Sequence, residues 1–255
     1  MRTPVTVSAD SDTVDALLRN IQNTEIVEFV DESSQLEDLE QYGLTGNQFL
    51  NLTLVSKEIN SEDDLFSGSD DQIDRIHIGN RTEDGRYFAH NPDRKPVFLV
   101  DSTLVQQLNL STYDVRDKIP VQFSRDQVTK IQIKRNGSTS FATSKDTAGI
   151  WTIFKPTKEP AKSWKINSLL TDLLDLKTQR FTDPRGGKSV LDIHLNGKSD
   201  LIAELKFFVE EAGIFLELNG TSEAYEIDVD SFSDIDLEID DVRQEATSVD
   251  TMSTR

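Results

Sequence analysis

Carboxylates are the side chains of this chain whose number and crowding could do chemistry. The 255 residues include 46 Asp and Glu against 27 Lys and Arg, which gives a formal net charge of −19. Acidic residues crowd two stretches, one within residues 58–74 and one between residues 228 and 241. Oxygen ligands of this kind suit Ca²⁺, but neither stretch has the Asp-x-Asp-x-Asp-Gly spacing of a calcium loop. The pattern favours a solvated acidic surface, and we expect no metal ligands.

The other side chains with chemical potential do not form a catalytic pattern. His77 and His194 each lie between two apolar residues of an expected strand, so alternation turns both imidazoles away from the core. His90 lies beside an Asn-Pro turn. The chain has no cysteine, no Walker loop and no Gly-x-Ser-x-Gly motif. We therefore expect no catalytic residue and no cofactor.

Residues 125–165 invert the charge of the chain, with nine basic residues against three acidic ones. In the run Lys130–Lys134 the polar residues alternate with isoleucines, which permits one charged strand face. This pattern predicts a docking face for anions or for a protein partner, although solvated strands and loops would give the same composition. The predicted face comprises Lys130, Lys134, Arg135, Lys155, Lys158, Lys162 and Lys165. Aromatic side chains for base stacking are sparse, so nucleic acid is not an expected ligand.

Two helices of matched pattern must help to position these side chains. Apolar residues at i, i+3, i+4 and i+7 predict one amphipathic helix over Val14–Ile21 and another over Ile166–Leu173, 152 residues later. Ser11 and Ser163 precede them as expected N-caps. The second helix carries additional leucines, and we expect it to be the better buried of the two.

Short apolar runs joined by tight turns follow each predicted helix. Asn-Gly pairs at residues 136, 196 and 219 accept the positive φ angles of hairpin turns, and strands joined in this way are antiparallel. Both segments end in Asp-Val-Arg, at residues 114–116 and 241–243, which lie 127 residues apart. Loss of the acidic run and shorter loops would account for the smaller offset. The sequence predicts an α+β fold of two tandem related units, each an amphipathic helix, an antiparallel β-meander and a short closing helix.

The predicted first unit covers residues 1–122, with an acidic insertion at 58–74. The predicted second unit covers residues 123–243 and opens with the basic stretch. Residues 244–255 have no apolar periodicity and are predicted to be a disordered tail. No apolar run approaches the roughly 18 residues of a membrane helix, and the start lacks the apolar core of a signal peptide.

Short motifs follow one another in a recognisable order along the chain. They are Ala9-Asp10, Val30-Asp31, Tyr42-Gly43-Leu44, Ile78-Gly79, Val97–Val100, Val115–Lys118 and Gly149–Ile153 with Pro156. In this order they resemble the bacterial family called domain of unknown function 4340, over residues 4–185. Two features depart from the family pattern. An N-terminal membrane helix is missing, and Thr45 follows the Tyr-Gly-Leu motif where proline is usual.

The resemblance implies a membrane-anchored protein whose globular part lies outside the cytoplasmic membrane, in the periplasm. Members are often encoded beside ABC-transporter subunits and gliding-motility-type proteins, and the family implies no catalytic residues. The expected function is therefore a non-enzymatic binding or scaffold domain, an accessory subunit of an ABC-type membrane complex with protein partners. Any membrane anchor would be a segment that this sequence does not include. Two alternatives stay open: a hydrolase acting on a glycan or peptide through paired carboxylates, and a calcium-tuned adhesion module.

Overall fold

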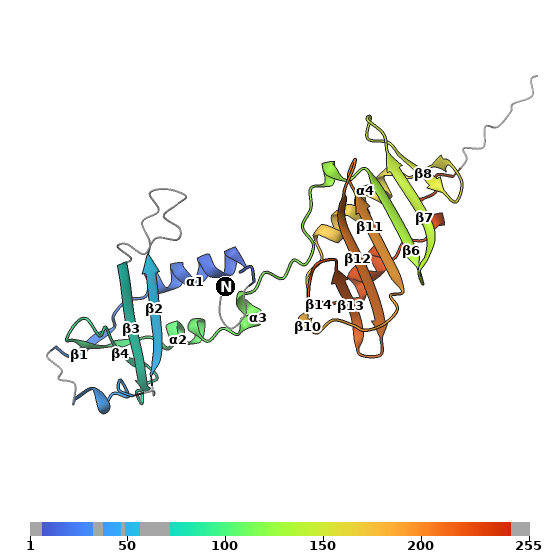
Figure 1. Cartoon of the computed structure of the whole chain (residues 1–255). Coiled ribbons are helices and arrows are strands. Elements are labelled where there is room, and N and C mark those ends of the chain that lie inside the picture. Colours follow the sequence, from blue (N-terminus) through green and yellow to red (C-terminus); the bar gives the residue numbers. More distant parts are fainter. Residues whose placement is uncertain (1–6, 33–37, 47–48, 57–71, 246–255) are drawn as a thin grey trace, which may run out of the picture. The chain divides into compact units, whose positions relative to one another are not determined.

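The computed structural model describes residues 7–32, 38–46, 49–56 and 72–245 (Figure 1). The fold is of the mixed α+β class, as predicted, with antiparallel sheets. The chain divides into two compact units. We call Ala9–Val115 the N-terminal unit, and Met1–Ser8 together with Arg116–Arg255 the C-terminal unit.

This division lies a few residues before the boundary expected after residue 122. Residues 117–122 group with the C-terminal unit because Val121 is buried in its core. The Asp117 N–H also donates a hydrogen bond to the Ser8 carbonyl at 3.1 Å, and Ser8 belongs to the same unit. The segment 117–122 is therefore part of the C-terminal unit and not a loose linker.

Two further predicted segments fall mostly outside the described residues. Of the acidic insertion, residues 58–71 are not described, whereas residues 72–74 belong to a strand. Of the predicted tail, residues 246–255 are not described. The Gln244 N–H donates to the Pro160 carbonyl at 3.2 Å, so the first residue of that predicted tail is bonded to the C-terminal unit.

The N-terminal unit is a five-stranded sheet in the order β1-β5-β4-β3-β2. Its strands are β1 (Glu28–Asp31), β2 (Leu50–Ser56), β3 (Gln72–Arg81), β4 (Tyr87–His90) and β5 (Val97–Val100). Its helices are α1 (Ser11–Gln22), α2 (Ser102–Leu108), α3 (Thr112–Val115) and the 3-10 turn η1 (Asp38–Glu40). The core between sheet and helices is small: Ile78, Phe98 and Val100 pack with Leu104 of α2 and Ile21 of α1.

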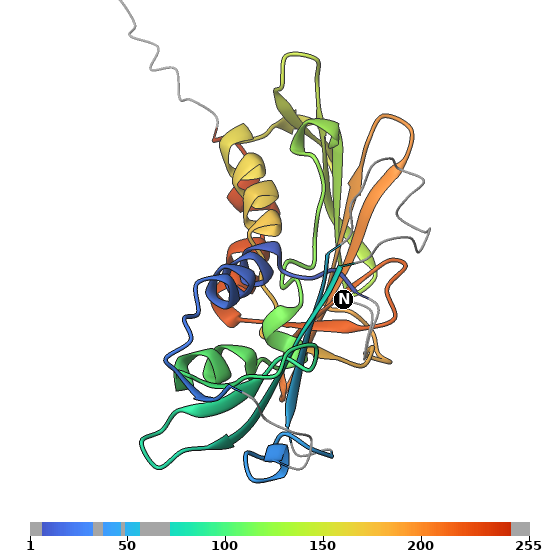
Figure 2. The ribbon, with the colours of Figure 1, turned by 90° about the vertical axis from the view of Figure 1, so that its left-hand side faces the viewer.

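The C-terminal unit is a nine-stranded sheet in the order β10-β14-β13-β12-β11-β6-β7-β8-β9. Its strands are β6 (Lys130–Arg135), β7 (Ser138–Lys145), β8 (Trp151–Lys155), β9 (Glu159–Pro160), β10 (Arg180–Thr182), β11 (Leu191–Asn196), β12 (Leu201–Glu210), β13 (Gly213–Leu218) and β14 (Ala224–Ile227). Its helices are α4 (Ser163–Leu174), α5 (Val229–Ile235), α6 (Ile239–Val242) and the 3-10 turn η3 (Arg125–Gln127). Figure 2 shows α4, in yellow, along one face of this sheet. The helix buries Ile166, Leu169, Leu170 and Leu173, which confirms that the second helix is the better buried.

Elements of the two units correspond in order and pairing, and the helices correspond in length as well. Helices α1 and α4 both have 12 residues and begin at residues 11 and 163, 152 apart. Helices α2 and α5 both have 7 residues and begin at residues 102 and 229, 127 apart. At these same offsets, Phe29 faces Phe98 across β1 and β5, as Phe181 faces Tyr225 across β10 and β14. Common descent of the two units stays a prediction, but positions in the two units can be compared one by one.

The helix starts differ from the predicted caps. Asp10 caps α1, because its carboxylate accepts the Thr13 N–H at 2.9 Å, and Ser11 is the first helical residue. Ser163 is likewise the first residue of α4. Its hydroxyl oxygen accepts the N–H of Trp151 at 3.0 Å and so fastens the helix to β8.

The two sheets differ at one edge. In the C-terminal unit β11 pairs with β12 on one side and with β6 on the other, and the sheet continues through β7 to β9. In the described part of the N-terminal unit, β2 pairs with β3 alone and ends the sheet. The strand that corresponds to a central strand of one unit is therefore an edge strand of the other.

Candidate binding sites

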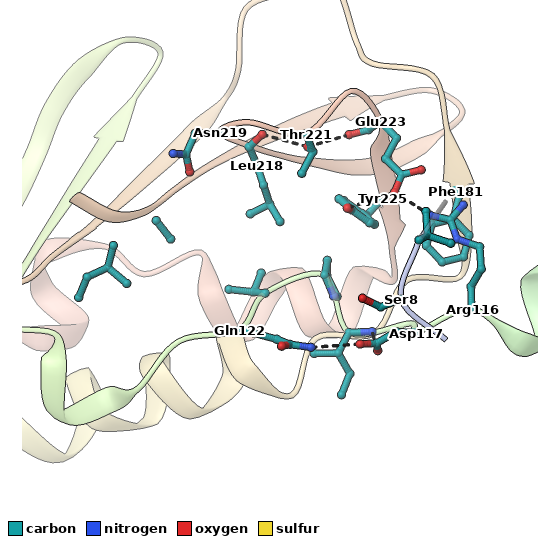
Figure 3. A pocket seen from close by; sticks show the side chains of 16 residues that line it. Ser8, Arg116, Asp117, Gln122, Phe181, Leu218, Asn219, Thr221, Glu223 and Tyr225 are labelled. Carbon is teal, nitrogen blue, oxygen red and sulfur yellow. Dashed lines mark hydrogen bonds and ion pairs between the residues drawn. The ribbon is translucent and has the colours of Figure 1, made fainter. Parts of the chain in front are cut away.

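A pocket of about 440 Å³ lies in the C-terminal unit between the segment 117–122 and the strands β10, β12, β13 and β14. Figure 3 shows Leu218 and Tyr225 extending from the strands toward Asp117 and Gln122 on the opposite wall. The pocket thus has one wall of regular sheet and one wall of extended chain.

Arg116 is the charged centre of this pocket. Its Nη2 donates to Oε1 of Glu223 at 2.6 Å, and its Cζ lies 3.4 Å from the centroid of the Phe181 ring (Figure 3). The Arg116 side chain is only 9% exposed, so the free-energy cost of burying its charge is offset by the ion pair with Glu223. Arg116 therefore ties the start of the segment to β10 and to the residue that precedes β14.

Tyr225 adds a hydroxyl group to the same cluster. Its O–H donates to Oε1 of Glu223 at 3.3 Å. Burial, followed by the nearby Glu223 carboxylate, raises the pKa of Tyr225 to about 12, and Arg116 opposes this shift. The phenol therefore stays protonated at neutral pH and acts as a hydrogen-bond donor rather than as a base.

The carboxylates that line the pocket are already engaged. Glu223 binds Arg116 and Tyr225. Asp117 accepts the Ile119 N–H at 2.9 Å and the Gln122 side-chain amide at 3.0 Å. General acid–base catalysis needs a carboxyl group within reach of substrate and able to exchange a proton. The arrangement is that of a bonded cluster and gives no support to carboxylate catalysis.

The N-terminal unit has an apolar groove at the corresponding position. Its volume is about 490 Å³. It is lined by Ile26, Phe29, Leu54, Asp74, Ile76, Asn91, Arg94, Pro96 and Phe98. Phe29 and Phe98 take the positions that Phe181 and Tyr225 hold in the pocket, since each pair is opposed in the same register. The corresponding location therefore carries a polar, hydrogen-bonded cluster in the C-terminal unit and a mainly apolar lining, with Asp74, Asn91 and Arg94, in the N-terminal unit.

The apolar lining of this groove is open to solvent. Phe29 is 53% exposed and meets Phe98 edge to face, with 6.2 Å between the ring centroids. Ile26 is also exposed, and Leu54 and Ile76 are only half-buried. Concave groups of exposed apolar side chains mark interaction surfaces in folded proteins. The groove is thus the stronger candidate for a binding site.

A family model described as Domain of unknown function (DUF4340) matches residues 1–193. The chain belongs to the DUF4340 family. The match spans all of the N-terminal unit and extends into β11 of the C-terminal unit. The comparisons with curated proteins and with solved structures found no match. The resemblance drawn from the motifs is confirmed, and the groove lies within the matched region.

The predicted basic docking face of this DUF4340 protein is spread over separate places. Lys130 and Lys134 lie on β6, on the face opposite its two buried isoleucines. Arg135 ends the same strand, and its guanidinium pairs with Asp236 at 2.6 Å and with Glu238 at 3.1 Å. The charge of Arg135 is therefore compensated within the C-terminal unit.

The other four predicted docking residues lie near the start of α4. Lys155 and Lys158 are exposed at the β8–β9 turn, and Lys162 and Lys165 belong to the N-cap and first turn of the helix. Cations at this end oppose the helix dipole, so an anion here would be stabilised. Binding of an anion or a partner by these residues stays a prediction.

Within the described residues, no three His, Asp or Glu side chains gather as they do in a metal site. His90, expected in a turn, ends β4 and is buried, with its Nδ1 3.2 Å from the Pro96 carbonyl oxygen. None of the described helices combines the length and the apolar character that crossing a membrane requires.

The sequence of this DUF4340 protein did not predict that Arg116, Glu223 and Tyr225 form one cluster. Arg116 and Glu223 are 107 residues apart, so no local spacing connects them. Two signals pointed to Arg116: the family motif Val115–Lys118, and the repeated Asp-Val-Arg, which marks Arg116 and Arg243 as corresponding positions. Arg243 pairs instead with Glu159 and Asp240, so even this signal does not predict the partner.

Proposed function

We propose that this DUF4340 protein is a non-enzymatic binding or scaffold protein, an accessory subunit of an ABC-type membrane complex on the extracytoplasmic side of the bacterial membrane. The open apolar groove of the N-terminal unit is the observation that carries the proposal. Covering its exposed side chains would contribute roughly 25 cal/mol for each Å² of apolar surface removed from water. A protein surface is the occupant that can supply such cover.

Charge supports a protein partner over nucleic acid or anionic lipid. The N-terminal unit contains 22 acidic residues and 7 basic ones in Ala9–Val115, a formal net charge of −15. A surface of this sign repels phosphates and attracts basic protein segments. The engaged carboxylates of the C-terminal pocket agree with a role other than hydrolysis.

The family resemblance supports the choice of complex. It implies a globular part outside the cytoplasmic membrane, held there by an anchor, and genes for ABC-transporter subunits nearby. An accessory subunit needs a surface for its neighbours rather than a reaction centre. The groove meets that need, and the periplasm is the compartment we propose.

Co-purification from native bacterial membranes tests this function. The full gene product is tagged, and its companions in detergent extracts are quantified for the unchanged protein and for Phe29→Asp. We expect the ATPase and membrane-spanning subunits of one ABC-type complex to be enriched about tenfold over the variant, which corresponds to about 1.4 kcal/mol of binding free energy. Trp164→Asp, an exposed aromatic residue of the C-terminal unit, is the matched control and should retain the complex. Equal recovery with Phe29→Asp, or no transporter subunit at all, would contradict the proposal.

A further inference from the structure

We propose that the N-terminal unit binds an extended partner segment, in which apolar residues alternate with basic and polar ones, by adding it as an antiparallel strand beside β2 and over the apolar groove. This inference rests on the proposed function as a binding protein and names the class of partner. The C-terminal unit carries the argument, because there the corresponding surface is covered by the chain itself.

The covering segment in the C-terminal unit runs from residue 117 to residue 135. Its last part is β6, which pairs antiparallel with β11. Ile133 lies opposite Ile193 and Ile131 opposite Leu195, and all four side chains are fully buried. The strand therefore seals that edge of the sheet with isoleucines on one face and leaves polar residues on the other.

Strand β2 is the counterpart of β11. Leu50 faces Ile78 in β3, as Leu191 faces Phe207 in β12. From Ile78 the cross-strand partners lead through β4 to Phe98 in β5, and from Phe207 they lead through β13 to Tyr225 in β14. Phe98 and Tyr225 are corresponding residues at the offset of 127, so Leu50 corresponds to Leu191. A strand added to β2 in the manner of β6 would therefore lie against Leu52 and Leu54.

Corresponding side chains differ sharply in exposure. Leu50 is 38% exposed, whereas Leu191 is 0% exposed. Because β2 pairs only with β3 in the described part of the chain, alternate backbone N–H and C=O groups along its other edge lack a strand partner. Such an edge accepts an added strand through main-chain hydrogen bonds, while side-chain pockets provide specificity.

The groove also contains a backbone N–H group whose counterpart in the C-terminal unit bonds the covering segment. In the C-terminal unit the Lys118 carbonyl accepts a hydrogen bond from the Thr178 N–H at 2.9 Å, and this bond holds the covering segment beside β10. Ile26 corresponds to Thr178 at the offset of 152. Among the described residues the Ile26 N–H has no hydrogen-bond partner. A segment crossing the groove would find there the donor that Thr178 offers.

Charge complementarity defines the partner further. Residues 117–135 contain five basic and two acidic residues, and they lie in the less acidic unit. The N-terminal unit has a net charge of −15, so a basic segment is favoured there more strongly still. The predicted occupant is therefore extended and basic, with isoleucine- or valine-like residues at every second position.

A peptide with the sequence of residues 117–135, labelled with a fluorophore, is the probe. It is titrated with the full chain, and fluorescence anisotropy is followed. We expect a Kd of about 10–100 µM, as for a weak strand addition, and a loss of about tenfold or more with Phe29→Asp. Because Phe29 is exposed, this variant should fold, and Ile26→Asp provides an independent second variant. Trp164→Asp should bind as the unchanged chain does, and a peptide with aspartate at both isoleucine positions of β6 should not bind.

Three results would overturn the inference. The first is no binding at about 1 mM peptide, and the second is an affinity in both groove variants equal to that of the unchanged chain. The third is a dimer of the chain in sedimentation that the peptide cannot dissociate. The last result would assign the groove to a second copy of this chain. Failure of the peptide together with successful co-purification would remove the strand-addition inference and leave the proposed function standing. If the peptide binds but no transporter subunit co-purifies, the proposed function is removed and the strand-addition inference stands.

Discussion

The two units contain corresponding helices and strands and differ in how these elements are covered. In the C-terminal unit, β6 to β9 extend the sheet, and the segment 117–124 adds Val121 and Phe123 to the core in which α4 buries four apolar side chains. In α1, all of which the structure describes, no residue is buried. Helix α4 carries more leucines than α1, and the extra elements give these leucines a surface to pack against. The comparison teaches that, among the described residues, the N-terminal unit has no counterpart of the elements that cover the corresponding surface of the C-terminal unit.

The largest expected effect separates Leu170 from Leu18, which hold the same position in α4 and α1. Leu170 is 1% exposed and Leu18 is 47% exposed. We expect Leu170→Ala to lower the free energy of unfolding by about 3 kcal/mol and Leu18→Ala by less than about 1 kcal/mol, because only the former leaves a cavity. Denaturant unfolding of both variants measures this. Equal losses would mean that α1 is covered after all.

The next effect compares Arg116 with Arg243. Arg116 is buried against Glu223 and the Phe181 ring, whereas the Arg243 side chain is 41% exposed. We expect Arg116→Gln to cost roughly 2–3 kcal/mol of stability, since it leaves the Glu223 carboxylate without its charge partner. Arg243→Gln should cost much less, and its cost should shrink further with added salt. Unfolding at low and high salt tests both, and a larger loss at Arg243 would contradict the assigned roles.

Helix caps should behave alike in the two units. Hydrogen bonds from Thr103 lower the pKa of Asp101, and hydrogen bonds from Ser231 lower the pKa of Asp228. Each folded-state pKa lies below the unfolded value near 4, so the stabilisation is present above that pH and is lost as pH falls through the folded value. Asp101→Asn and Asp228→Asn should both flatten the acid side of the melting-temperature profile. A flattening in one unit only would break the correspondence.

Much of the local structure could be predicted from the sequence. Both amphipathic helices are present, and the Asn136-Gly137 turn has φ angles of 50° and 83°, as a hairpin of this kind requires. The prediction was wrong for Asn196-Gly197, where neither φ is positive, and in Asn219-Gly220 only the glycine φ is positive. The long-range pairings could not be predicted, because nothing near Arg116 indicates Glu223. Arg135 illustrates the same limit: its charge indicated docking, but the fold brings the α5–α6 connection to it.

The smallest effect concerns Tyr225, whose counterpart Phe98 has no hydroxyl. With a pKa of about 12, Tyr225 should titrate well above an ordinary tyrosine when phenolate absorbance is followed. Because the folded pKa is the higher one, the contribution to stability is complete below about pH 10 and is lost as pH rises toward 12. Tyr225→Phe should remove this late titration. An ordinary midpoint in the unchanged protein would contradict the burial of the phenol.

Hydrogen exchange along β2 and β11 tests the central claim most directly. In the free protein, the outward-facing amides of Asn51 and Thr53 in β2 should exchange much faster than the corresponding amides of Asp192 and His194 in β11, which face β6. Addition of the 117–135 peptide should slow exchange in β2 and leave β11 unchanged. Protection of β2 equal to that of β11 before any peptide is added, or peptide protection elsewhere, would contradict the claim that β2 is an open docking edge.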